Sequence, residues 1–150
     1  WKALETLYLD KRVRAVGVSN YLPPFMEELF GYAELTPAVN QVEFSPYLYL
    51  KELLDLCRQR GVVLQAYSPL ARGQRMNDPK LTALAEKHGK TPAQVMLRWI
   101  LQHGVSAIPK SANLKRLQEN FDVFDFRLTD DDMAAMDNFN ENFRVVDDPT

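Results

Sequence analysis

Cations and hydroxyl groups capable of binding a phosphate gather in residues 105–120, which read VSAIPKSANLKRLQEN. The short apolar run at the start of this segment predicts a strand, and Asn113 is a suitable N-cap for the amphipathic helix that follows. Arg116 would then lie in the first helical turn, where a cation opposes the positive end of the helix dipole unless an anion is bound. With Lys110 and the Ser111 hydroxyl nearby, the segment suits a phosphate group. A solvated basic loop fits the same spacing, and both interpretations remain open on spacing alone.

Polar residues also lie at or near the carboxyl ends of three earlier strand-like runs. These residues are Ser19, Asn20, Gln41, Glu43, Tyr67 and Ser68. The expected strands span 13–18, 38–44, 62–67 and 105–108. A helical pattern follows each run, and this alternation predicts parallel strands joined by crossover helices. The carboxyl ends of parallel strands share one face, which holds the active site in a β/α barrel, so we expect the polar residues to converge.

Two α/β architectures satisfy this alternation, a TIM-type (β/α)8 barrel and an open doubly wound sheet. The open sheet usually holds a nucleotide with a Gly-rich turn, but the six glycines supply neither GxGxxG nor a P-loop. A phosphate-bearing ligand would therefore be held by side chains. Four βα units in about 120 residues would form half of a barrel of about 250 residues. Capping signals mark where helices begin and end: N-caps at Asp78 and Thr129, a capping box at Thr91-Pro92-Ala93-Gln94, and a helix end at Gly61. A helix near 129–136 and a polar tail from Asn140, expected to be loose, would complete the chain.

Composition limits the classes of function. The 150 residues, 46% hydrophobic and 25% charged, suit a single domain with a buried core. A net charge of −2 gives no basic field for a nucleic acid, and no apolar run reaches the roughly 18 residues of a membrane span. The single cysteine, Cys57, fits a reducing compartment, so we expect a cytoplasmic protein. The chain lacks an initiator Met and opens inside a helical pattern, which leads us to expect a fragment.

Four motifs in order along the chain resemble those of the aldo-keto reductases. They are GVSN at 17–20, VNQVE at 39–43, QAYSPL at 65–70, and IPKS at 108–111 with Arg116, Glu119 and Asn120. The resemblance implies a (β/α)8 barrel that binds NADP(H) and reduces aldehydes or ketones to alcohols. Residues 1–150 would be a single-domain fragment supplying the last four βα units, a half barrel, together with the C-terminal helix and tail.

The resemblance also implies a set of cofactor-binding residues. Carried over position by position, the set is Ser19, Asn20, Gln41, Tyr67, Ser68, Pro69, Leu70, Arg72, Lys110, Ser111, Ala112, Asn113, Arg116, Glu119 and Asn120. Ser19, Asn20 and Gln41 would hydrogen-bond the nicotinamide carboxamide, which offers both donors and an acceptor. Tyr67 would stack on the nicotinamide ring, and residues 68–72 would run along the pyrophosphate.

The adenosine end of the cofactor would be held by the basic cluster. Lys110, Ser111 and Arg116 would bind the 2′-phosphate, and Glu119 and Asn120 would contact the adenine. NADH would leave the two cations without a partner, so we expect a preference for NADPH.

The catalytic Asp, Tyr, Lys and His of this family come from the first half of its barrel, and no position here matches them. We therefore expect no catalytic residue in this chain and no metal site. The expected partners are a small carbonyl substrate and either the missing N-terminal half or a second copy, since strands at 13–18 and 105–108 would present open edges. A non-catalytic NADP(H)-binding module, or a half barrel that assembles with another copy, is the alternative.

Several residues suggest chemistry but are better explained as structural. His88 and His103 each precede a glycine that ends a helix, and Cys57 lies in an apolar helical pattern. Glu43 is expected to be a buried partner of a polar group rather than a catalytic acid. Two arginines, Arg72 and Arg75, suit either a free surface loop or a lid over the pyrophosphate. The tail residues Asp147 and Asp148 are expected to be solvated.

Overall fold

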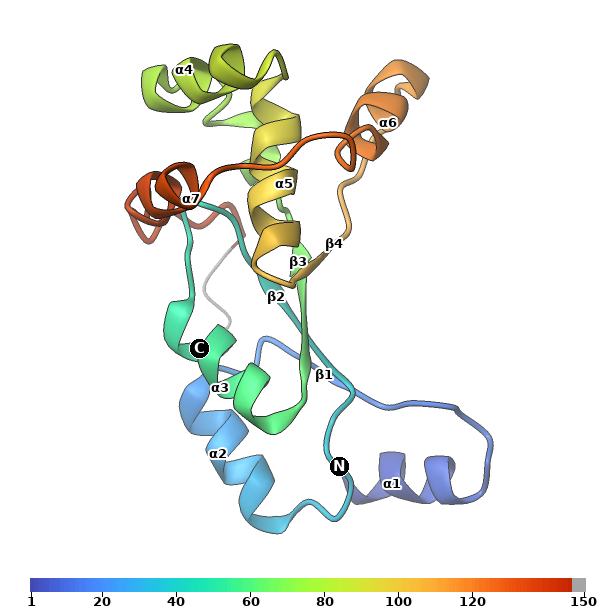
Figure 1. The fold of residues 1–150 in the computed structure, drawn as a ribbon. Helices are drawn as coiled ribbons and strands as arrows, with labels where there is room; N and C mark the ends of the chain where they lie inside the picture. The colour runs from blue at the N-terminus through green and yellow to red at the C-terminus, as the bar shows by residue number, and fades with distance from the viewer. Residues whose placement is uncertain (147–150) are drawn as a thin grey trace. The chain divides into compact units, whose positions relative to one another are not determined.

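The structure is a computed structural model that describes residues 1–146, and its chain forms two compact units. Unit 1 comprises Trp1–Val42 and Leu50–Gln65, and unit 2 comprises Glu43–Tyr49 and the chain from Ala66 onward. The described residues form a parallel-strand α/β fold in which the strand order is β1-β2-β3-β4 (Figure 1). This order follows the chain, as expected for successive βα units. The expectation for Asp147 and Asp148 lies outside the described residues.

Unit 1 contains the first strand pair and the helices that follow it. Its elements are α1 (Lys2–Leu9), β1 (Val18–Ser19), α2 (Pro23–Tyr32), most of β2 (Val39–Glu43), α3 (Lys51–Arg60) and the start of β3 (Val63–Tyr67). Strands β1 and β2 are parallel, with Ser19 opposite Gln41. The expected strand at 13–18 is wrong in extent, because its first residues are largely exposed and only Val18–Ser19 enters the ladder. A Cβ on Gly17 would lie 2.4 Å from Cγ1 of Val39, so the absent side chain permits the two strands to approach.

Unit 2 contains the second group of helices. Its elements include a 3-10 turn η1 (Ala71–Gly73), α4 (Pro79–His88), α5 (Pro92–Gln102), β4 (Ser106–Ala107), α6 (Leu114–Phe121) and α7 (Asp130–Asp137). Helix α5 contacts α4, α6 and β4 (Figure 1). Side chains cap four of these helices as the sequence predicts: Asp78 caps α4, Thr91 caps α5, Asn113 caps α6 and Thr129 caps α7. The expected strand at 105–108 is shorter in the structure, because Pro109 and the turn to α6 leave only two residues in the ladder.

The core of unit 2 is centred on Trp99 of α5. Its indole stacks on Phe44 with ring centroids 5.4 Å apart, and Nε1 donates to Oδ1 of Asp137 at 2.8 Å. Trp99, Phe44 and Met136 are fully buried. In unit 1, Cys57 is fully buried as expected, and burial raises its thiol pKa to about 11. Trp99 and Cys57 are therefore structural residues of their respective cores.

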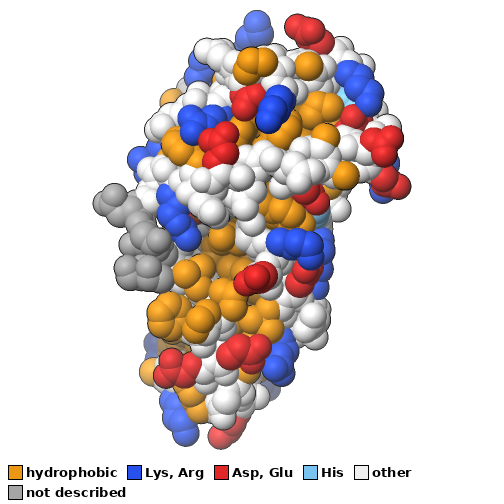
Figure 2. Space-filling view, turned by 90° about the vertical axis from the view of Figure 1, so that its left-hand side faces the viewer, with side chains coloured by type: hydrophobic (Ala, Val, Ile, Leu, Met, Phe, Trp, Pro, Cys, Tyr) orange, Lys and Arg blue, Asp and Glu red, His pale blue; other side chains and the backbone are white. Residues whose placement is uncertain are grey.

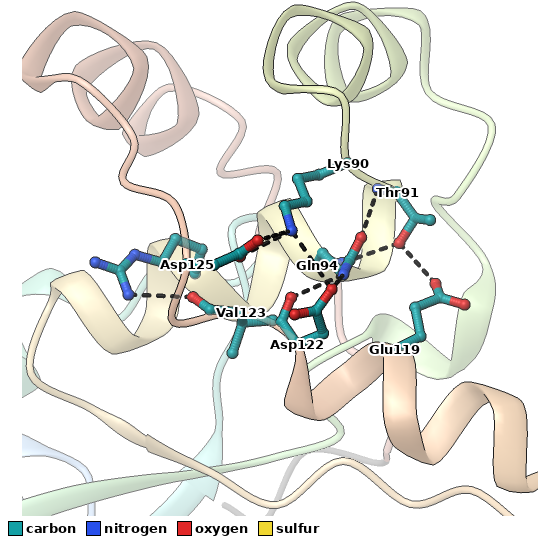
Figure 3. A network of polar contacts seen from close by, with 8 residues as sticks. Lys90, Thr91, Gln94, Glu119, Asp122, Val123 and Asp125 are labelled. Atoms are coloured by element: carbon teal, nitrogen blue, oxygen red, sulfur yellow. Dashed lines mark hydrogen bonds and ion pairs between the residues drawn. The ribbon is translucent and has the colours of Figure 1, made fainter.

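A row of polar side chains on α5 holds the extended segment that follows α6. Gln94 Nε2 donates to the carbonyl oxygen of Asp122 at 2.8 Å, and Arg98 Nη1 donates to that of Val123 at 3.1 Å (Figure 3). Gln102 both donates to the carbonyl oxygen of Leu128, at 3.0 Å, and accepts from its N–H, at 2.8 Å. The three residues are four apart and therefore lie on one face of α5.

The described part of the tail, residues 140–146, is anchored, contrary to expectation. Buried Glu43 accepts the N–H groups of Val145 at 2.7 Å and Val146 at 3.1 Å. The guanidinium of Arg75 lies 3.7 Å from the ring centroid of Phe143 and bonds Glu141 as well. Polar composition suggested a loose tail, but these groups supply partners for its backbone. Glu43 is thus a buried structural partner, as predicted.

Both units leave apolar side chains exposed. On α1 the exposed residues include Leu9, and on α6 they include Leu114 and Phe121, which are 70% and 78% exposed. Figure 2 shows one face of the molecule, on which hydrophobic side chains gather in one area among interspersed charges of both signs. Within residues 1–146, every helix is too short or too polar to cross a membrane.

Candidate functional site

Unit 2 contains a cleft of about 1000 Å³ between the turn after β3, the start of α5 and the segment from β4 to α6. Most of the predicted cofactor residues line it. They are Ser68, Pro69, Leu70, Arg72, Lys110, Ser111, Ala112, Asn113, Arg116, Glu119 and Asn120. A volume of this size lies at the upper end of ligand sites. The structure therefore brings together residues from two of the predicted strand ends.

The cationic wall of the cleft is built by the turn from β4 into α6. Asn113 caps α6 by accepting the Arg116 N–H at 3.2 Å, and the Ser111 hydroxyl accepts the Asn113 N–H at 3.1 Å. These local bonds fix the turn, so Lys110 and Arg116 both line the cleft. No carboxylate among residues 1–146 lies within ion-pair distance of either cation. Two such cations beside a helix N-terminus form an arrangement suited to an anion.

The turn after β3, which also lines the cleft, carries a strained backbone. Ser68, Ala71 and Arg72 have φ values of 48°, 47° and 49°, in the left-handed region that non-glycine residues rarely adopt. Each such residue costs of order 1 kcal/mol or more, and such strain is concentrated at functional sites. Arg72 lines the cleft, whereas Arg75 pairs with Glu141 at 3.0 Å, so the two arginines differ in role.

The end of the cleft is joined to α5 through Glu119. The Thr91 hydroxyl donates to Oε1 of Glu119 at 2.6 Å, and both residues line the cleft (Figure 3). Behind them, Lys90 bonds Asp125 at 2.6 and 2.8 Å, and this contact raises the pKa of Lys90 and lowers that of Asp125. The sequence marks Thr91 only as an N-cap, because its contact with a residue 28 positions away has no local signal.

Three predicted residues lie together in unit 1. The Ser19 hydroxyl and the Asn20 N–H both donate to the carbonyl oxygen of Gln41, at 2.8 and 2.9 Å. The Gln41 side-chain amide donates to Oε1 of Gln65 at 2.7 Å. Tyr67 is the last residue of β3, directly before the cleft residue Ser68, and is half-buried. The convergence of these residues with the cleft on one ligand stays a prediction.

The two histidines each lie beside an aspartate outside the cleft. His88 Nε2 lies 2.9 Å from Oδ2 of Asp132, and His103 Nε2 lies 2.9 Å from Oδ1 of Asp137. Asp132 lies in the first turn of α7, where the helix dipole favours an anion. Within the described part of the chain, no group of three or more His, Cys, Asp or Glu side chains is placed to hold a metal ion.

The chain is similar in sequence and in structure to known oxidoreductases. The chain is 52% identical over 149 residues to a glyoxal reductase from Bacillus subtilis, covering 99% of this chain and 54% of that protein. Among solved structures, Gox0644 in its apo form matches with a TM-score of 0.95 and 39% identity, over 100% of this chain and 56% of that one. A Bombyx mori aldo-keto reductase in complex with NADP matches with a TM-score of 0.91 and 36% identity, over 98% and 51%.

The chain spans about half the length of the curated relatives it matches. The family model for the aldo/keto reductase family matches residues 1–141, nearly the whole of the described sequence. The fold, with its parallel strands and alternating helices, matches solved members of that family. The chain therefore belongs to the aldo/keto reductase family.

Proposed function

We propose that this chain is the NADP(H)-binding part of an oxidoreductase that reduces small aldehydes or ketones to alcohols. The observation that carries the proposal is the cleft of unit 2, where Lys110 and Arg116 line the wall without a carboxylate partner among the described residues. A dianionic 2′-phosphate would supply that partner, and cations form strong charge-assisted hydrogen bonds with phosphate. A relative named glyoxal reductase and a neighbour solved with NADP support the same conclusion.

The volume of the cleft and the positive charge of its lining residues suit a nucleotide cofactor. When bound, NADPH supplies a hydride to a carbonyl carbon. Lys110, Ser111 and Arg116 would hold the adenosine phosphate, and residues 68–72 would lie along the pyrophosphate. We further propose that Ser19, Asn20 and Gln41 hydrogen-bond the carboxamide and that Tyr67 stacks on the nicotinamide ring.

Titration with NADPH and NADH tests the proposal directly. We expect tighter binding of NADPH, and we expect Lys110→Gln and Arg116→Gln each to weaken it about fivefold to tenfold, because exposed charge contacts are worth about 1 kcal/mol. Lys115→Gln is the matched control, since Lys115 is an exposed cation on α6 that does not line the cleft. Equal affinities for the two cofactors would refute the proposal, as would an equal loss in the control.

We assign no proton donor to this chain and propose that the catalytic groups come from further βα units. Open strand edges and the exposed apolar face of α6, which carries Leu114, Leu117 and Phe121, support such a partner. The chain alone is then expected to bind the cofactor without reducing a nitrobenzaldehyde, and to associate in sedimentation. Turnover by the chain alone, or a monodisperse monomer, would contradict this assignment. A cytoplasmic location belongs to the same proposal, because a reducing compartment keeps Cys57 as a thiol.

The alternative is a non-catalytic NADP(H)-binding module that assembles with a second copy. The same exposed face of α6 favours it, because a copy of this chain could cover that surface as well as further units could. Adding an N-terminal half barrel from a relative distinguishes the two: gained turnover supports the enzyme, and persistent inactivity supports the module.

A further inference from the structure

Two opposite charges on α6 stand close in sequence but do not pair. Arg116 and Glu119 are three residues apart on α6, and both line the cleft. Residues three apart on a helix are neighbours, so an arginine and a glutamate in these positions normally attract one another. Among residues 1–146, however, no ion pair joins them. The Glu119 carboxylate is instead held by a different hydrogen-bond donor.

That contact is the Thr91 hydroxyl. It donates to Oε1 of Glu119 at 2.6 Å, while its oxygen accepts the Gln94 N–H at 3.3 Å (Figure 3). The Gln94 side chain accepts the Thr91 N–H in return, at 2.9 Å, which completes a capping box. The single proton of the hydroxyl is thus committed to Glu119, and the cap fixes the side chain that carries it.

The same end of α5 also holds the C-terminal end of α6. Gln94 Nε2 donates to the carbonyl oxygen of Asp122 at 2.8 Å, and Lys90 lies 3.5 Å from the Asp122 carboxylate. Helix α6 has no buried residue of its own, so these polar contacts position it against α5. Thr91 and Glu119 are therefore held at a fixed separation by groups outside the cleft.

We infer that Thr91 is a positioning residue that sets the nucleotide preference: by holding Glu119, it keeps the Arg116 guanidinium available to the 2′-phosphate of the nucleotide. This inference rests on the proposed cofactor-binding function. Without the hydroxyl, the Glu119 carboxylate would turn toward Arg116 and partly neutralise the cation that the phosphate needs. The effect on nucleotide preference is specific to the 2′-phosphate, since a change in the adenine contact of Glu119 would be shared by nucleotides with and without that phosphate.

The test compares 2′,5′-ADP with 5′-AMP, two probes that differ only in the 2′-phosphate. In calorimetric titrations with the full chain, Thr91→Val is expected to lower the ratio of their affinities about twofold to fivefold, because a Glu119 carboxylate turned toward Arg116 neutralises the cation only in part. Thr91→Ser keeps both the cap and the hydroxyl and should retain the ratio. Because any adenine contact of Glu119 affects both probes alike, the ratio in Thr91→Val/Glu119→Gln should equal the ratio in Glu119→Gln alone. The valine also removes a cap, and this loss persists in the double variant, which separates it from the effect on Arg116.

An equal loss of affinity for both probes in Thr91→Val, or no recovery in the double variant, would overturn the inference. A second measurement does not depend on a nucleotide: the Arg116 Nε–H resonance, assigned by its loss in Arg116→Lys, should shift in Thr91→Val relative to wild type. The same change should leave it in place in the Glu119→Gln background. If the wild-type protein binds neither probe, the proposed function fails. In that case the Arg116 Nε–H resonance still tests whether Thr91 keeps the Glu119 carboxylate away from Arg116. An unshifted resonance in Thr91→Val would then refute the inference.

Discussion

Removing the charge of Asp132 should destabilise unit 2 in a pH-dependent way. Its carboxylate is 5% exposed and accepts hydrogen bonds from Lys87 at 2.6 Å and from the Thr129 hydroxyl at 2.8 Å, with His88 at 2.9 Å. Burial raises the pKa of Asp132, but the bonds from Lys87, Thr129 and His88 outweigh it, so the net pKa is well below the usual value. The variant Asp132→Asn keeps the shape of the side chain and removes the charge.

The size of the effect follows from these contacts. A hydrogen bond to a charged group contributes about 1.5–3 kcal/mol, and breaking a buried ion pair costs about 3–5 kcal/mol. Lys87 is 54% exposed and can return to water, which reduces the loss. We therefore expect Asp132→Asn to lower the free energy of unfolding by about 2–4 kcal/mol at pH 7. Asp131→Asn, an exposed change in the same helical turn, should cost about 0.5 kcal/mol or less.

Urea unfolding at several pH values measures this difference. A carboxylate whose folded-state pKa is lowered contributes stability above its unfolded pKa of about 3.9, and this contribution is lost as pH falls through the folded-state value. The difference between wild type and Asp132→Asn should therefore be full at pH 6 and shrink below about pH 4. A difference that grows in acid, or a loss no larger than that of Asp131→Asn at pH 7, would refute the assignment of Asp132 as a buried, hydrogen-bonded anion.

Three further substitutions test the packing by urea unfolding. Gly17→Ala should cost about 1–3 kcal/mol, because its Cβ would lie 2.6 Å from the carbonyl oxygen of Val39; an unchanged midpoint would contradict the close approach of the strands. Glu43→Gln leaves one acceptor for two N–H groups, so we expect a loss of about 1–3 kcal/mol and faster proteolysis of the tail, and equal proteolysis would argue against this anchor. Tyr47→Phe should leave stability unchanged or raise it by about 1 kcal/mol, since the buried hydroxyl has no hydrogen-bond partner among residues 1–146; a clear loss would reveal one.

Features governed by neighbouring residues could be predicted from the sequence. The sequence predicts Asn113 as the cap of α6 and the Thr-Pro-Ala-Gln run at Thr91 as a capping box, because a cap bonds N–H groups two or three residues away. The cap fixes where α6 begins, and this places Arg116 in the first turn of the helix, near Lys110. The sequence likewise predicts that Gly61 ends α3, and its φ of 70° is in the left-handed region that glycine favours.

Features governed by distant residues could not be predicted. The extent of β1 depends on which residues of β2 lie opposite, and only Val18 and Ser19 pair. The contact of Thr91 with Glu119 joins two helices, and the anchor of Val145 on Glu43 spans 102 positions. Local residue type and spacing do not specify such contacts, because each one depends on how segments far apart in the sequence pack together.

The polar row on α5 has a consequence for how this region can vary. Gln94, Arg98 and Gln102 bind mainly the main chain of residues 122–128, and Gln94 also donates to the Asp122 carboxylate at 3.4 Å. Exposed side chains within that segment, such as Phe124, can thus be exchanged at little energetic cost, whereas Val123 and Leu128 are buried in the core. The length of the segment cannot be changed in this way, since deleting one residue would move the carbonyl oxygens out of step with the helix and break several bonds together. Helix α5 therefore fixes the length of the segment, and we expect insertions and deletions there to be more damaging than exchanges of its exposed side chains.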